Sequence, residues 1–123
     1  MISRILVCLD DSARAPHVAI VAKELAAHLR ATFIPFRAIP FPQDFPAAGA
    51  GGKPDALLDL LREQATHALE ALVAPFTGVD VAPPVVGVVP ARAIISSAER
   101  LNVDLIAIGS HGYHGWDLAT GEA

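Results

Sequence analysis

The sequence predicts an α/β domain with a Rossmann-like, three-layer α/β/α architecture and a mostly parallel sheet of four strands. Two observations carry this prediction. Short apolar runs without polar alternation are typical of strands buried on both faces, and amphipathic helical segments separate these runs along the chain. Parallel neighbours need a crossover connection, usually a helix, and such crossovers are right-handed, so helices are expected on both faces of the sheet.

Four apolar runs are interpreted as strands. They are residues 5–9, 32–38, 85–89 and 103–108. The third run begins after a break at Pro83 and Pro84. The second run contains Pro35, which has no backbone N–H to donate to a neighbouring strand. We therefore expect this strand to lie at a sheet edge or beside a bulge.

Three segments carry apolar residues at helical spacing. The first is expected to begin at an N-cap provided by Asp11 or Ser12, and the other two cover residues 55–73 and 90–102. The apolar stripe of the first helix comprises Val18, Val21, Ala22, Leu25, Ala26 and Leu29. Residues 39–54 are rich in proline and glycine, which favours a loop.

Composition and length indicate one domain, residues 1–123. The chain has 9 Lys and Arg residues against 13 Asp and Glu, a formal charge of -4, which is opposite to the balance of a nucleic-acid binder. No segment approaches the ~18 consecutive apolar residues of a membrane span, and the N-terminus shows no signal-peptide pattern. The single cysteine, Cys8, cannot form an internal disulfide. We expect a cytoplasmic protein that binds neither nucleic acid nor membranes.

Two strand ends carry residues suited to ligand binding. Asp10, Asp11 and Ser12 follow the first strand, and a loop bounded by Gly109 and Gly112 follows the last. In open parallel sheets, ligands bind outside the carboxyl ends of the strands. Glycines let backbone N–H groups approach an anion, and a carboxylate can accept hydrogen bonds from ribose hydroxyls. The pattern favours a nucleotide site, although the same glycines would also serve only to turn the chain.

Two segments resemble the universal stress protein (UspA) family. Residues 5–12 (Ile-Leu-Val-Cys-Leu-Asp-Asp-Ser) resemble its first strand and aspartate, and residues 103–112 (Val-Asp-Leu-Ile-Ala-Ile-Gly-Ser-His-Gly) match its most characteristic segment. The resemblance extends over essentially the whole chain. It implies the strand order 3-2-1-4-5 and frequent dimerisation through the last strand. It also implies ATP binding in one branch of the family, while another branch lacks nucleotide.

The resemblance assigns a nucleotide site residue by residue. Asp10 resembles the aspartate that contacts the nucleoside, and Ala38 resembles the position whose backbone meets adenine. Gly109 and Gly112 match the first two glycines of the family's Gly-x2-Gly-x9-Gly-Ser/Thr phosphate motif, and Gly121 follows at a spacing one residue shorter. The expected nucleotide-binding residues are Asp10, Ala38, Gly109, Ser110, His111, Gly112 and Gly121. Mg2+ is expected only with the nucleotide, and no separate metal site is expected.

The end of the sequence departs from the family pattern. Glu122 occupies the position of the Ser or Thr that offers a hydroxyl to phosphate. A carboxylate there would repel phosphate oxygens by about 1 kcal/mol or more. Family members continue into a last helix and a fifth strand, whereas this sequence ends at Ala123. We expect a C-terminally shortened member with an impaired phosphate site and an exposed edge on the strand of residues 103–108.

Two functions are compatible with these observations. The first is an adenine-nucleotide (ATP)-binding regulatory module of the stress response, which Asp10 and the glycine pair favour. The second is a nucleotide-free module that keeps the fold and binds a protein partner, or a second copy, through the exposed edge of its last strand or through the loop of residues 39–54, which carries Phe41 and Phe45. The sequence shows neither an adenylate-forming motif nor a nucleophile with a histidine partner, so we expect no enzyme activity beyond slow ATP hydrolysis.

Overall fold

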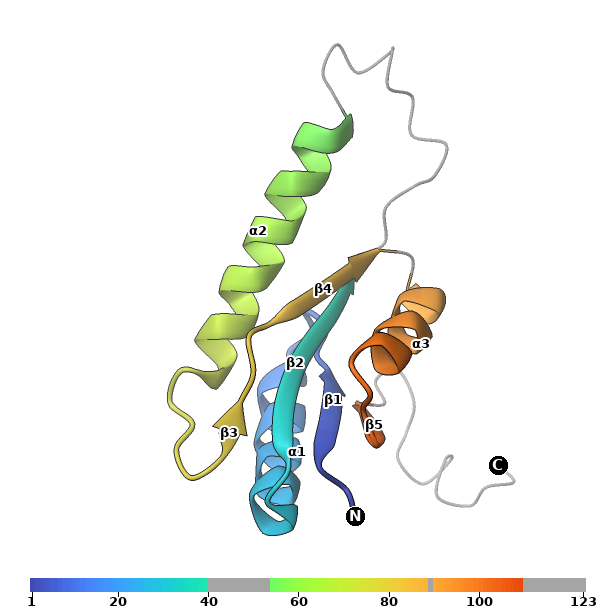
Figure 1. Cartoon of the computed structure of the whole chain (residues 1–123). Helices are drawn as coiled ribbons and strands as arrows, with labels where there is room; N and C mark the ends of the chain where they lie inside the picture. The colour runs from blue at the N-terminus through green and yellow to red at the C-terminus, as the bar shows by residue number, and fades with distance from the viewer. Residues whose placement is uncertain (40–53, 89, 110–123) are drawn as a thin grey trace, which may run out of the picture.

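A computed structural model describes residues 1–39, 54–88 and 90–109, which form one sheet with helices packed on it (Figure 1). In chain order the elements are β1 (Arg4–Cys8), α1 (Ala15–Leu29), β2 (Thr32–Ile39), α2 (Pro54–Val73), β3 (Asp80–Val81), β4 (Val85–Val88), α3 (Pro90–Arg100) and β5 (Leu105–Ile108). None of these helices is long and apolar enough to cross a bilayer. The predicted alternation of strands and helices is confirmed.

All strand pairs in the described part of the chain are parallel. β1 lies between β2 and β5, while β3 and β4 both pair with the outer side of β2. β3 pairs with the start of β2 at Thr32 and Phe33, and β4 pairs with its end. Five strands therefore form where four were expected, because the segment around Pro83 and Pro84 divides the third position of the sheet into two short strands.

Pro35 is fully buried within β2, and β2 is an inner strand, so the expected edge position is wrong. The backbone of Phe33 faces β3, since its carbonyl accepts the N–H of Ala82 (2.9 Å), and alternation places Pro35 on the same side. There β3 has ended and β4 has not begun, and two residues of β2 oppose residues 82–84. Pro35, which has no N–H to donate, therefore faces an irregular, bulge-like gap between β3 and β4. This agrees with the alternative expectation that Pro35 lies beside a bulge.

The sheet is covered on both faces, which confirms the three predicted layers (Figure 1). Side chains alternate along a strand, so β1 directs Ile5 and Val7 to one face and Leu6 to the other. On the first face they pack with α1 and with Leu69 of α2. On the second face, Leu6 packs with Phe36 and with residues of α3. Two buried clusters, one on each face, therefore fix the sheet between its helices.

The first helix begins later than expected. Its N-cap is Arg14, which makes no capping hydrogen bond through its side chain, and the helix starts at Ala15 with proline in its first turn. Asp11 and Ser12 are not the cap, because the chain first makes a separate turn after β1. Proline suits this position since the first N–H groups of a helix have no intrahelical acceptor.

The buried face of α1 matches the predicted stripe only in part, since Ala22 and Ala26 are buried as expected. Its buried residues are Ala15, Ala19, Ala22 and Ala26. By contrast, Val21 is 54% exposed and Leu25 is 40% exposed. Small alanine side chains let the helix approach the sheet closely, so Val18 and Leu29 pack at the margin of the core while Val21 and Leu25 face outward.

Candidate functional site

The carboxyl ends of the parallel strands meet at one edge of the sheet, and this edge carries the candidate site. Asp10 follows β1, Ala38 lies near the end of β2, and Gly109 directly follows β5. Because β1 pairs with both β2 and β5, these positions lie on neighbouring strand ends. The fold therefore gathers the predicted site residues that belong to its described part.

The loop that carries Asp10 is a compact turn between β1 and α1. The backbone N–H of Ser12 donates to Asp10 Oδ1 (3.0 Å), and the N–H of Arg14 donates to Ser12 Oγ (3.3 Å). The N–H of Ala15 then donates to the carbonyl of Ser12 (3.1 Å). Asp and Ser side chains commonly bind the backbone two residues further on, which explains the turn. These bonds hold the Asp10 carboxylate at the edge of the sheet.

Arg37 of β2 links two strand ends, a role that was not predicted from the sequence. Its Nε–H donates to the carbonyl of Leu9 and its Nη2 donates to the carbonyl of Asp10, each at 2.8 Å. Hydrogen bonds from a charged donor are stronger than those between neutral groups. Arg37 therefore holds the loop after β1 against the end of β2. The only signal of this role in the sequence is a charged residue within an otherwise apolar strand.

A cleft of about 540 Å³ opens between these strand ends and α2. It is lined by Asp10, Asp11, Ser12, Arg37, Ala38, Ile39, Leu61, Gln64 and Ala65. The volume lies within the range of about 300–1,000 Å³ that is typical of small-molecule sites. The charged groups come from the strand ends, and α2 adds apolar surface from Leu61 and Ala65 and the amide of Gln64. This contribution of α2 was not predicted from the sequence.

Gly109 lies beside the same loop. Together with Asp10 and Ser12 it lines a small pocket of about 10 Å³, which is close to the volume needed for one water molecule. A Cβ atom on Gly109 would lie 2.5 Å from Cγ2 of Val18 in α1. Packing against α1 therefore requires a glycine here, independently of any role in anion binding.

The rest of the expected phosphate loop, Ser110, His111, Gly112 and Gly121, lies outside the described residues, as does Glu122. Of the seven predicted positions, Asp10 and Ala38 meet at the cleft, and Asp10 and Gly109 meet at the small pocket. Within residues 1–39, 54–88 and 90–109, no three His, Cys, Asp or Glu side chains are placed to hold a metal ion.

Cys8 also lines the small pocket, at the end of β1. Burial raises the pKa of its thiol to about 11. Since the thiolate is the nucleophilic form, the protonated Cys8 thiol is unreactive at neutral pH. The surroundings of Cys8 are therefore those of a packing residue.

The sequence matches the family model of the universal stress proteins over residues 1–119, and the chain belongs to this family. The match spans both the strand that leads to Asp10 and the strand that leads to Gly109. A search of curated protein sequences found no match. Family membership confirms the resemblance inferred from residues 5–12 and 103–112.

Solved structures share the fold. A universal stress family protein from Burkholderia pseudomallei is 28% identical, with a TM-score of 0.68, and the match covers 98% of this chain and 91% of that one. The universal stress protein UspA from Lactobacillus plantarum is 21% identical, with a TM-score of 0.67 and coverage of 91% and 81%. A universal stress protein in complex with cAMP is 20% identical, with a TM-score of 0.52 and coverage of 85% and 70%.

Proposed function

We propose that this protein is an adenine-nucleotide-binding regulatory module of the stress response, with ATP as the expected ligand. The observation that carries the proposal is the cleft at the carboxyl edge of the sheet, where Asp10, Arg37 and Ala38 meet apolar residues of α2. Membership of the universal stress protein family supports it. A further support is the complex with cAMP formed by a protein of related fold.

Each part of the cleft suits one part of a nucleotide. Leu61 and Ala65 offer apolar surface to a base, and Ala38 contributes backbone polar groups beside it. The Asp10 carboxylate can accept hydrogen bonds from hydroxyl or amino groups. The phosphates, with Mg2+, are expected toward Gly109 and the glycine loop, and Glu122 is expected to weaken their binding.

We propose binding rather than turnover. The Cys8 thiol is protonated at neutral pH because burial raises its pKa to about 11. The Ser12 hydroxyl accepts the N–H of Arg14 and forms part of a structural turn. Neither side chain has the features of an activated nucleophile. ATP hydrolysis is therefore expected to be slow at most.

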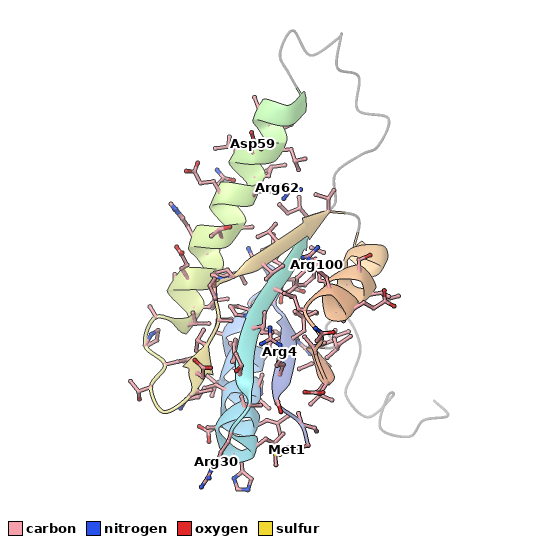
Figure 2. The ribbon with its side chains drawn as sticks, viewed as in Figure 1. Met1, Arg4, Arg30, Asp59, Arg62 and Arg100 are labelled. Atoms are coloured by element: carbon pink, nitrogen blue, oxygen red, sulfur yellow. The ribbon has the colours of Figure 1, made fainter. Side chains whose placement is uncertain are left out.

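Calorimetric titration of ATP with Mg2+ into the purified protein tests the proposal. We expect binding in the micromolar range by the wild type and about tenfold weaker binding by Asp10→Asn, since the charge of the acceptor is lost. The asparagine oxygen can still accept the N–H of Ser12, so the turn should persist. Asp59→Asn is the matched control, because Asp59 is exposed on α2 and does not line the cleft (Figure 2).

One outcome would reject the nucleotide function. If circular dichroism shows a folded wild type that gives no binding heat with millimolar ATP, the cleft does not bind this nucleotide. If Asp59→Asn weakens binding as much as Asp10→Asn, the effect of Asp10 is one of net charge rather than of contact.

A specific observation favours the second candidate, a module that binds a protein partner or a second copy. Ile108 of β5 is 63% exposed. Beside it, an apolar groove of about 270 Å³ runs between β5 and α1 and includes Val21 and Leu25. Exposed apolar surface of this kind commonly marks an interaction site. The groove and the cleft share no lining residue, so the two functions are open to separate tests.

A further inference from the structure

The guanidinium group of Arg37 has one edge bound to the protein and one edge left for a ligand. Nε and Nη2 donate to the carbonyls of Leu9 and Asp10, and these two donors form one edge of the planar group. Three of its five N–H groups remain, one on Nη2 and two on Nη1. In the described part of the chain these three have no hydrogen-bond acceptor, while Arg37 lines the cleft.

The two carbonyl bonds also orient the group. A guanidinium that is bound at two points loses less conformational freedom when it binds a ligand than a side chain that moves freely. Its remaining edge presents N–H donors in a fixed plane, which suits an acceptor that lies in that plane. Leu61 and Ala65 supply apolar surface in the same cleft. A planar, acceptor-bearing ring fits these two requirements.

The charges around Arg37 decide which part of a nucleotide it contacts. Asp10 and Asp11 line the same cleft, so its ionised groups sum to one net negative charge. An anionic phosphate placed here would be repelled by two carboxylates, whereas a neutral purine would not be repelled. A purine carries ring-nitrogen acceptors for Arg37, and an aminopurine also carries donor groups for Asp10.

We propose that Arg37 is the base-reading residue of the cleft, and that it donates to a ring nitrogen of the adenine base while Asp10 accepts from the ligand's amino or hydroxyl groups. This inference rests on the proposed nucleotide function and makes it more specific. It predicts that recognition depends on the base and the nucleoside and that the phosphates contribute elsewhere.

The test compares ligands that differ in the base with ligands that differ in phosphate. Adenosine, ATP with Mg2+, and deaza analogues of adenosine that each lack one ring nitrogen are titrated calorimetrically into the wild type and Arg37→Gln. We expect the wild type to bind at least one deaza analogue about tenfold more weakly than adenosine. Arg37→Gln should bind adenosine and ATP more weakly by the same factor, about tenfold, and should no longer distinguish that analogue from adenosine.

Two further variants separate contact from charge and from structure. Arg37→Lys keeps the positive charge but not the planar group, so it should behave as Arg37→Gln does. Arg30→Gln removes the same charge from the C-cap of α1, just before the start of β2 and away from the cleft, and should leave binding unchanged (Figure 2). Thermal unfolding of each variant shows whether the loss of the two carbonyl bonds has unfolded the protein. If Arg37→Gln does not fold, Arg37→Lys gives the same comparison of adenosine with the deaza analogue.

The outcomes distinguish this inference from the proposed function. If the wild type binds adenine nucleotides and the folded Arg37 variants keep the discrimination against the deaza analogue, the base-reading role is overturned and the nucleotide function stands. If Arg37→Gln weakens ATP but not adenosine, and Arg37→Lys restores ATP binding, Arg37 contacts phosphate instead. If the wild type binds none of the ligands, both proposals are rejected.

Discussion

At the scale of single residues, one exposed carboxylate connects the N-terminus to the last described strand. Asp104 Oδ2 accepts the backbone N–H groups of Ser3 (2.8 Å) and Arg4 (3.0 Å). Arg4 also donates from Nε to the carbonyl of Leu101 (2.8 Å). Because the two N–H donors stabilise the charged form, the pKa of Asp104 lies below its ordinary value of 3.8.

This lowered pKa predicts a pH-dependent contribution to stability. The contribution is complete above the pKa that Asp104 has in the unfolded chain, and it disappears as the pH falls through the lower pKa of the folded state. Asp104→Asn keeps an acceptor but removes the charge, so we expect a lower urea midpoint than wild type at neutral pH. The two midpoints should converge at acid pH, once the pH has fallen below the ordinary pKa of Asp104 and through its lower pKa in the folded state.

Urea unfolding followed by circular dichroism across this pH range provides the measurement. Asp59→Asn, on the exposed surface of α2, serves as the control for a general change in net charge. A constant difference between wild type and Asp104→Asn at all pH values would show that the ionisation of Asp104 does not contribute to folding.

At the scale of elements, the existence of the strands and helices could be predicted, but their exposure could not. Uninterrupted apolar runs such as residues 103–108 suit a strand buried in a parallel sheet, and β5 (Leu105–Ile108) forms there. On α1, periodicity indicates a helix but leaves open which apolar residues face the sheet. The alanines pack inward because they allow close approach, while Val21 remains more than half exposed. That choice depends on the shape of the sheet rather than on the helix alone.

Only part of the candidate site could likewise be predicted from the sequence. Asp10 and Ala38 could be placed because each follows or ends a recognisable strand and resembles a family position. Arg37 could not, since its role depends on the carbonyls of Leu9 and Asp10, which are 28 and 27 residues away in sequence. The wall formed by Leu61 and other residues of α2 could not be predicted either, because it requires the packing of α2 against the sheet.

Contact between β5 and α1 leads to a prediction at this scale. A Cβ on Gly109 would lie 2.5 Å from Cγ2 of Val18, so Gly109→Ala should destabilise the protein by about 1–3 kcal/mol through overpacking. Val18→Ala removes the obstructing methyl groups. The double variant should therefore be more stable than the sum of the two single changes implies, by about 1 kcal/mol. Denaturant unfolding of the four proteins measures this coupling, and additive effects would show that the backbone after β5 moves instead.

At the scale of the whole molecule, the described structure presents two different surfaces. The carboxyl edge of the sheet carries a cleft with charged groups, and the side formed by α1 and β5 carries an apolar groove. Arg37 and α2 belong to the first surface, whereas Leu25 and Ile108 belong to the second. A regulatory module needs both a ligand site and a surface that reports its occupancy. The separation of the two surfaces allows each to be disabled without altering the other.

The exposed edge of β5 predicts self-association that depends on Ile108. Ile108 is 63% exposed, so Ile108→Lys should cost little folding stability, but a lysine ammonium buried between two copies would lack a partner. We expect the wild type to sediment as a dimer at micromolar concentration and Ile108→Lys to associate at least about tenfold more weakly, since burying an unpaired charge at an interface costs 2–5 kcal/mol or more. Ile20→Lys is the matched control, because Ile20 is 52% exposed on α1 yet does not line the groove.

Sedimentation of the wild type as a monomer at all concentrations would exclude a second copy, and equal weakening by both lysines would assign the effect to charge alone. Since Ile108 is outside the cleft, Ile108→Lys should still bind ATP as the wild type does, which distinguishes loss of the interface from loss of the fold.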